Sequence, residues 1–318
     1  MGDLLFMYLK PGETAILRDC EIRMSNPCWL NDPFDFKPGT LSDISDKELL
    51  AQLKDQSSNL YRVLDERIDR PLRQIVPKVT TFWELLASDE TEALRVLKGR
   101  WSYIEDGVME LLCRDAENHW RLACFTLRDD GILLWTHYAN KHRGFVVAFE
   151  REALDRAAEN LFQQASRPDL PGGGHWPVEY RSTRPVIQHI LVPREDMEKV
   201  FRDVVVTKSL EWAYEEESRI LLPKVLFDPE AGIADCRCGP AVDEGCPRNG
   251  PGIQHSYWKF DPASVKQVIF GARSDPSDLQ QKIREILSQP KFKHVELRQA
   301  TPHRSRFEIE VKPVPSSA

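Results

Sequence analysis

Short apolar segments typical of β-strands occur near both ends of the chain. Residues 4–9 and 20–25 are the first two, with Gly12 and Thr14 opening a helical turn between them. Strand-like segments return after residue 119, where apolar, β-branched and aromatic residues run between short polar turns. The strands expected from there on are residues 120–127, 144–149, 176–181, 212–222, 266–271, 294–300 and 306–311.

A long segment with helical periodicity separates the two strand regions. Apolar residues over 41–118 recur about every 3.6 positions, as Leu49, Leu50 and Leu53 do, and predict three or four helices. Residues 195–211 and 277–287 are also expected to be helical. Because strands on both sides of the helical block must bury against something, we predict one α+β domain over 1–318. Its core is a mixed or antiparallel sheet shared by residues 4–9, 120–127, 144–149, 212–222 and 266–270, with 41–118 as a helical insertion.

Composition restricts the class of protein to which the chain can belong, but it says little about the chemistry that the protein performs. The 318 residues are 41% hydrophobic and 29% charged, enough apolar material for a sizeable core. A net charge of −7 provides no global basic field that would draw the chain to nucleic acid. Apolar runs fall short of the ~20 residues of a membrane span, and the N-terminus is expected to be a strand rather than a signal peptide. Scattered single cysteines are typical of a reducing compartment, so we expect a cytoplasmic protein without a membrane partner.

The first candidate for chemistry is LLWTHYANKHRGF, residues 133–145. As a short helix it would present Trp135, Tyr138 and His142 on one face, while His137 points elsewhere. Two aromatic rings and an imidazole on one face can stack against a planar ligand. The same spacing is also typical of an amphipathic turn that packs Trp135 and Tyr138 into the core.

The second candidate is the acidic run in TKSLEWAYEEESRILL, residues 207–222. On a strand, Glu215, Glu217 and Arg219 alternate onto one face. Such a face can be a solvated charge ladder or a charged helix surface. It can also line a cleft, where crowding raises the pKa of one carboxylate and Arg219 anchors the other.

Two further segments have weaker patterns. Residues 228–256 are rich in Cys, Gly and Pro and are expected to form an irregular loop, of which the part from Cys236 to Cys246 is expected to be dispensable for folding. Its Cys236, Cys238, Cys246 and His255 fit none of the usual zinc spacings, so we expect no metal there. Asn31 to Asp35 reads as a turn stabilised by its own side chains, although Asn31 can also face a ligand.

Several common catalytic signatures do not occur in the sequence. It contains no G-x-G-x-x-G after a strand, no P-loop, no H-E-x-x-H and no G-x-S-x-G. Dehydrogenases, P-loop NTPases, zinc proteases and α/β-hydrolases are therefore disfavoured.

Taken in order, these segments resemble a bacterial family, the domain of unknown function 2971. The resemblance begins with the strand FMYLK at residues 6–10 and the N-D-P-F-D loop at residues 31–35. Its central motif, L-W-[ST]-H-Y-A-x-x-H-x-G-F, matches residues 134–145. Residues 208–219 match K-S-x-x-W-x-Y-E-x-E-x-R, and a late strand ending in Ile-x-x-G matches residues 268–271 loosely.

More distantly, the chain resembles the ADP-ribosyltransferase-like superfamily. That resemblance implies a split β-sandwich around NAD as substrate, with a glutamate on a late strand in an E-x-E motif. It implies that Glu217 is the catalytic glutamate and that Glu215 engages the acceptor, with His137 as a further catalytic candidate. The residues then expected around the nucleotide are Tyr8, Asn31, Trp135, Tyr138, His142, Lys208 and Arg219.

The leading functional hypothesis is an NAD-using ADP-ribosyltransferase or NAD glycohydrolase, serving as a toxin or phage-defence effector. Its partner is NAD or a related nucleotide, and the acceptor can be protein, nucleic acid, a small molecule or water. One alternative is a metal-dependent nuclease in which Glu215, Glu217 and His137 hold the ion. The other is a non-catalytic sensor that binds a nucleotide or a partner protein. We also expect residues 31–35, 133–145 and 208–219 to converge on one cleft, with Glu217 facing inward.

Overall fold

The computed structural model describes residues 4–27, 30–39, 45–55, 82–100, 116, 119–164, 174–185, 197–227 and 256–314. The cysteine-rich segment 228–256 therefore lies outside the described residues, apart from its last residue. The described strands are β1 (Leu4–Leu9), β2 (Glu21–Met24), β3 (Trp120–Thr126), β4 (Phe145–Glu150), β5 (Gly174–Pro177), β6 (Glu179–Arg181), β7 (Thr207–Ser209), β8 (Glu217–Pro223), β9 (Ser256–Lys259), β10 (Val265–Phe270), β11 (Glu296–Pro302) and β12 (Ile309–Pro313). The helices of four or more residues are η1 (Ile16–Cys20), α1 (Asp46–Lys54), α4 (Phe82–Ser88), α5 (Glu90–Lys98), α7 (Ile132–His137), α8 (Arg151–Gln164), α9 (Met197–Val206), η3 (Leu210–Glu215), η4 (Lys224–Phe227) and α10 (Leu279–Leu287).

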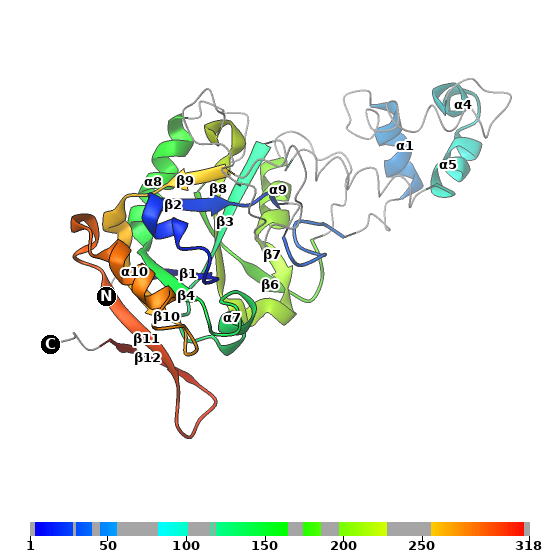
Figure 1. The fold of residues 1–318 in the computed structure, drawn as a ribbon. Coiled ribbons are helices and arrows are strands. Elements are labelled where there is room, and N and C mark those ends of the chain that lie inside the picture. Colours follow the sequence, from blue (N-terminus) through cyan, green and yellow to red (C-terminus); the bar gives the residue numbers. More distant parts are fainter. Residues whose placement is uncertain are drawn as a thin grey trace.

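An eight-stranded sheet forms the centre of the molecule, in the order β12-β11-β10-β4-β1-β3-β8-β5 (Figure 1). Its neighbouring strands run antiparallel except for the parallel pair β10 and β11. Strands β2 and β9 form a small second sheet, and β6 pairs with β7 in a third. The fold is thus α+β with a mixed, mostly antiparallel main sheet, as the sequence predicts.

The main sheet is nearly divided between β1 and β3. These two strands are joined at a single pair, Phe6 with Thr126, whereas β1 pairs with β4 along its whole length. Beyond that pair the two strands separate, and their side chains border an opening that no ladder hydrogen bonds close. This division of the sheet positions the cavity described below.

Both faces of the sheet centre are buried, which explains the continuous apolar sequence of β4. Phe145, Val147 and Phe149 face one hydrophobic cluster, together with side chains of α8 and α10. Val146 and Ala148 alternate onto the opposite face. A strand covered on both sides needs apolar residues at every position.

The helical block predicted for residues 41–118 is helical where the structure describes it, in α1, α4 and α5. Figure 1 shows these three helices to one side of the main sheet. Their apolar side chains, such as Leu53, Phe82 and Leu97, belong to a cluster that also includes Trp120 of β3 and Val205 of α9. No helix within the described residues is long and apolar enough to cross a membrane.

One predicted strand is wrong in its first half. Residues 212–215 are not extended, because Leu210–Glu215 forms the 3₁₀ helix η3 and the strand β8 begins only at Glu217. The Ser209 side chain accepts a hydrogen bond from the backbone N–H of Glu211 and starts the helix. Glu216, with φ of 43°, ends it in the left-handed region. Similarly, the helix expected over 195–211 ends at Val206, and residues 207–209 become β7.

Candidate active site

A cavity of about 160 Å³ lies at the division of the main sheet. Its walls come from β1, from the loop after β2, from β3, from α7 and its C-terminal cap, and from the β7–η3–β8 segment. Segments 31–35, 133–145 and 208–219 therefore converge on one cavity, which confirms that prediction. The lining residues are Phe6, Met7, Tyr8, Leu30, Asn31, Asp35, Cys124, Phe125, Thr126, Leu134, Tyr138, Lys208, Glu215 and Glu217.

The left-handed turn at Glu216 brings two carboxylates together. Glu215 ends the 3₁₀ helix and Glu217 begins β8, and both side chains line the same cavity. The backbone here is also fixed from β3, since the Thr126 hydroxyl donates to the carbonyl oxygen of Glu215. The expected strand alternation of Glu215 and Glu217 is thus wrong, and a helix end followed by a turn places the two groups side by side instead.

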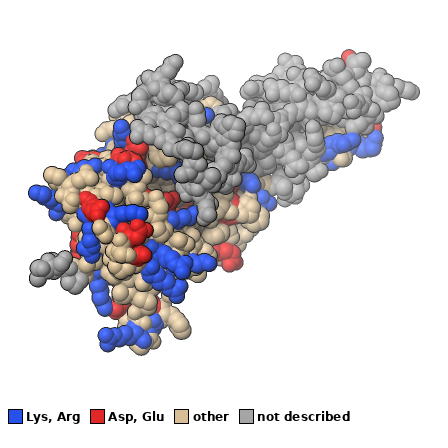
Figure 2. All heavy atoms as spheres, in the orientation of Figure 1, with Lys and Arg blue, Asp and Glu red and all other residues tan. Residues whose placement is uncertain are grey.

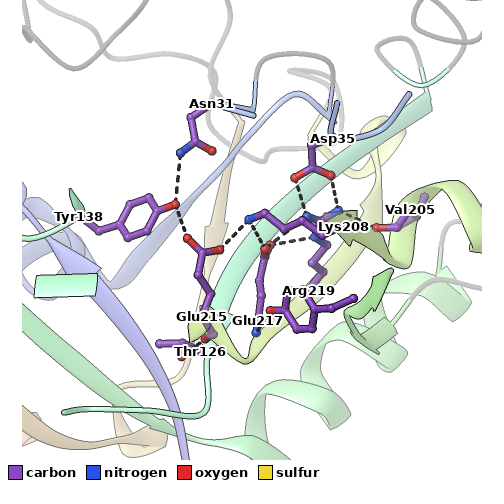
Figure 3. Close-up of polar contacts among 10 residues, drawn as sticks. Asn31, Asp35, Thr126, Tyr138, Val205, Lys208, Glu215, Glu217 and Arg219 are labelled. Carbon is purple, nitrogen blue, oxygen red and sulfur yellow. Dashed lines mark hydrogen bonds and ion pairs between the residues drawn. The ribbon is translucent and has the colours of Figure 1, made fainter. Parts of the chain in front are cut away.

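Lys208 links the two carboxylates. Its Nζ donates to Glu215 Oε2 at 2.6 Å and to Glu217 Oε2 at 2.7 Å (Figure 3). The ammonium also lies 5.0 Å from the centroid of the Trp212 ring, a favourable cation–π position. Burial alone would lower the pKa of Lys208, but the charges of Glu217 and Glu215 outweigh it, so the pKa is raised and the ammonium stays charged.

Arg219 holds Glu217 from the other side. Its Nε donates to Glu217 Oε1 at 2.8 Å, and its two terminal nitrogens donate to the two Asp35 carboxylate oxygens at 2.9 and 2.7 Å. One of these nitrogens also donates to the carbonyl oxygen of Val205 at 2.6 Å. The Arg219 side chain is 0% exposed, so this bidentate pair is shielded from solvent and joins residues 184 positions apart.

These contacts fix the charge of Glu217. Burial alone would raise the pKa of its carboxyl group, but the positive charges of Arg219 and Lys208 and their hydrogen bonds outweigh burial and lower it to about 2. Glu217 is therefore ionised throughout the physiological pH range. Its backbone N–H donates to the Tyr180 hydroxyl at 2.6 Å, which anchors the start of β8.

Tyr138 connects the central motif to this network. Its hydroxyl donates to Glu215 Oε1 at 2.7 Å and accepts from Asn31 Nδ2 at 3.2 Å. Burial raises the pKa of Tyr138, and the neighbouring Glu215 charge raises it further, so the phenol keeps its proton and acts as the donor. Each carboxylate of the pair thus has two side-chain partners, and their orientation is set before any ligand arrives.

Other predicted site residues lie elsewhere. Trp135 is 0% exposed, packs in the core, and does not line the cavity. His142 stacks on it at 6.2 Å between ring centroids instead of continuing a helix face, because α7 ends at His137. His137 is exposed and does not line the cavity either. Tyr8 does line it, and its hydroxyl donates to the carbonyl oxygen of Arg128 at 3.1 Å.

Sequence reasoning missed three contributors to the site. Asp35 was assigned to a turn, although its position in the N-D-P-F-D motif was the available signal for a second role. No sequence pattern around Thr126 or Tyr180 identifies either residue as part of a site. Their contacts with Glu215 and Glu217 depend on how distant strands are placed.

The lysine bridge also bears on metal binding. No group of three or more His, Cys, Asp or Glu side chains suited to a metal ion occurs among the described residues. Between Glu215 and Glu217, where a divalent ion would bind, the Lys208 ammonium already contacts both carboxylates. We predicted that no zinc binds to Cys236, Cys238, Cys246 and His255. These four residues lie outside the described residues.

The fold and site define an α+β protein with a carboxylate-lined cavity where its main sheet divides. Comparison with known families adds a match: the model of the family described as "Protein of unknown function (DUF2971)" covers residues 134–220. The matched segment includes the motifs at 134–145 and 208–219. The segments at 6–10, 31–35 and 268–271 lie outside the matched range. No curated protein and no solved structure matches the chain.

Proposed function

We propose that the cavity cleaves the bond between nicotinamide and ribose in NAD, as an ADP-ribosyltransferase or an NAD glycohydrolase does. The observation that supports this most is the pair Glu215 and Glu217, held side by side at the wall of a cavity that apolar and aromatic side chains also line. Three carboxylates and one ammonium line the cavity, so its formal charge is negative. The nicotinamide ring of NAD is flat and positively charged, and it suits apolar walls with carboxylates between them.

The reaction needs negative charge close to C1 of the ribose. As the bond from C1 to the ring nitrogen breaks, its electron pair stays on nicotinamide and positive charge develops on the ribose. Glu217, ionised and fixed by Lys208 and Arg219, supplies a preorganised negative charge there. An oxygen of water or of an acceptor then bonds to C1 and gives up its proton to the surrounding water, and Glu215 is placed to orient that oxygen.

The divided sheet supports the same proposal at the level of the fold. A main sheet that opens between β1 and β3, with the glutamate pair at the start of β8, is the arrangement expected for an ADP-ribosyltransferase-like split sandwich. Fold alone does not fix an activity, so the weight rests on the carboxylate pair. The role of the chain as a toxin or phage-defence effector stays a prediction.

The nuclease alternative has less support from the site. It requires Glu215, Glu217 and His137 around one ion, but His137 does not line the cavity and Lys208 bridges the carboxylates. A sensor needs only a binding cavity, so the geometry of the site does not distinguish it from an enzyme. A measurement of turnover does.

The test is release of nicotinamide by the purified full-length protein from NAD labelled on the nicotinamide ring. A second label on the adenylate side reports transfer to protein, nucleic acid or water. We expect release that persists in the presence of a chelator. No release under any condition, together with saturable NAD binding, would overturn the proposal in favour of a sensor.

Two variants and one control assign the roles. Glu217→Gln is expected to lower release at least about 100-fold, because it removes charge that stabilises the transition state. Glu215→Gln is expected to reduce transfer more than binding. Glu211→Gln, in the same 3₁₀ helix but exposed, should behave as wild type. Circular dichroism of each variant checks that loss of activity is not loss of fold.

A further inference from the structure

A second cavity of about 250 Å³ adjoins the first, and Lys208 lines both. It lies between the turn around Asp35, the end of β6 with the residues that follow it, the end of α9, and β7. Its described lining residues are Phe34, Lys37, Arg181, Ser182, Thr183, Arg184, Pro185, Val204, Thr207, Lys208 and Ser209. We infer that this cavity binds the phosphate groups of the nucleotide whose other end occupies the first cavity. The identity of that nucleotide rests on the proposed function, whereas phosphate binding can be tested without it.

The lining of the second cavity is positively charged. Four cationic side chains face this cavity, and its described lining contains no Asp or Glu. Figure 2 shows that Lys and Arg side chains intermingle with Asp and Glu side chains over the described part of the face that it draws. A cavity with cations alone therefore differs from the mixed surface seen there. Phosphate groups are the anions that such a combination of guanidinium, ammonium and hydroxyl groups binds well.

The cations differ in how firmly they are already paired. Lys208 is occupied by its two glutamates, and Arg181 pairs with Glu179 at 2.6 Å. Lys37 and Arg184 have no carboxylate partner among the described residues. Arg184 instead lies over the Phe34 ring, with its guanidinium carbon 5.6 Å from the ring centroid, and both side chains line the cavity. Lys37 and Arg184 are the cations available to a ligand.

The second cavity also contains a buried hydroxyl group without a hydrogen-bond partner among the described residues. Thr207 lines this cavity and is only 7% exposed, yet its Oγ1 has no hydrogen-bond partner among the described residues. An unpaired buried polar group is costly to keep unless something binds it. An oxygen of a phosphate group accepts a hydrogen bond from such a hydroxyl, so the ligand would satisfy the group that the protein leaves unsatisfied.

The two cavities together match a ligand with opposite charges at two places. The first has a negative lining and the second a positive one, and they meet at Lys208. The first is smaller than the roughly 300–1,000 Å³ of most ligand sites, so it takes only one end of a dinucleotide. A nicotinamide riboside end in the first cavity directs the diphosphate of the same molecule toward Lys37 and Arg184.

The test is calorimetric titration of the full-length protein with inorganic pyrophosphate and with ADP-ribose, neither of which contains nicotinamide. We expect both to bind to the wild type, with affinity that falls as salt rises. The double variant Lys37→Gln/Arg184→Gln should bind both at least about tenfold more weakly, since charge-assisted bonds are lost. The matched control Lys141→Gln/Arg143→Gln removes two exposed cations from the turn after α7 and should bind as wild type does.

Thr207→Val tests whether the Thr207 hydroxyl binds a ligand or only contributes to stability. The substitution keeps the side-chain shape and removes the unpaired hydroxyl, so the melting temperature without ligand should stay the same or rise while pyrophosphate affinity falls. Equal affinity in wild type, Thr207→Val and the Lys37/Arg184 double variant would overturn the inference, as would no pyrophosphate binding by the wild type. Pyrophosphate binding without nicotinamide release would reject the proposed function alone, and release without pyrophosphate binding would reject this inference alone.

Discussion

The two adjoining cavities use charge in different ways. In the first, Glu215 and Glu217 are paired with Lys208 and Arg219, and the side chains of all four are at most 5% exposed. In the second, Lys37 and Arg184 lie at the wall without a carboxylate partner among the described residues. Paired buried charges hold a geometry, and unpaired accessible charges attract a ligand. The comparison teaches that a count of charged residues does not reveal which of the two a cluster does.

The largest expected effect separates the buried Arg219, which pairs with Glu217 of the first cavity, from Arg181, which lines the second. Arg219→Met leaves Asp35 and Glu217 without their main partner in a buried position and should lower the free energy of unfolding by about 3–5 kcal/mol. Arg181→Met removes only an exposed pair with Glu179 and should cost less than about 1 kcal/mol. Urea denaturation of both variants measures the difference. Similar costs would show that the network around Arg219 is not what holds the site together.

The pH dependence of stability also distinguishes a buried, paired carboxylate from an exposed one. The pKa of Glu217 is lowered from its ordinary 4.5 to about 2 in the folded protein, so its stabilisation is complete above pH 4.5. It is lost as the pH falls from about 4.5 to 2, and the amount is on the order of 3 kcal/mol. Glu217→Gln should therefore have a flatter stability curve over that range. Glu92→Gln removes an exposed carboxylate whose pKa is lowered by its hydrogen bond from Arg95. Because solvent screens this exposed pair, the stability curve of the variant should stay close to that of the wild type. An unchanged slope for Glu217→Gln would contradict the paired geometry.

Tyr138→Phe tests the link from the central motif to the carboxylates. It removes the hydrogen bond to the charged Glu215 at 2.7 Å and should cost about 1.5–3 kcal/mol. Tyr214→Phe, in the same 3₁₀ helix as Glu215, should change stability by less than about 0.5 kcal/mol. Thermal unfolding of the two variants compares them, and a cost for Tyr138→Phe no greater than that of the control would remove Tyr138 from the network.

The smallest expected effect lies in the second cavity. Lys37→Gln/Arg184→Gln should change the free energy of unfolding by less than about 0.5 kcal/mol, because neither side chain has an ion pair among the described residues. The same variant loses pyrophosphate affinity, so binding and stability are expected to separate there. A stability loss comparable to that of Arg219→Met would mean that these cations, too, are structural.

The strands of the main sheet could be predicted where both faces are buried. β4 has an unbroken apolar segment from Phe145 to Phe149, and β10 ends in the apolar residues Val268 to Phe270. Such segments are typical of a covered strand, and the structure confirms both strands. The strand prediction for residues 212–215 failed because Trp212 and Tyr214 are residue types that strands favour. The Ser209 cap and the left-handed Glu216 decide its conformation instead, and neither is visible in an alternation pattern.

The candidate site was only partly predictable for a similar reason. Its residue types mark Glu215, Glu217 and Tyr138 as polar groups in unusual settings, and they do meet in one cavity. Trp135 was expected to face a ligand, but an aromatic spacing does not distinguish a stacking surface from a core contact. The pairing of Arg219 with Asp35 joins residues far apart in sequence, so it depends on the tertiary fold.

A crystal structure of the 318-residue protein with ADP-ribose and nicotinamide bound together tests the two-cavity proposal most directly. We expect the nicotinamide ring in the cavity lined by Tyr138, Glu215 and Glu217, and the diphosphate between Lys37 and Arg184 with an oxygen at the Thr207 hydroxyl. A diphosphate beside Glu215 and Glu217, or both ligands bound away from Lys208, would contradict it.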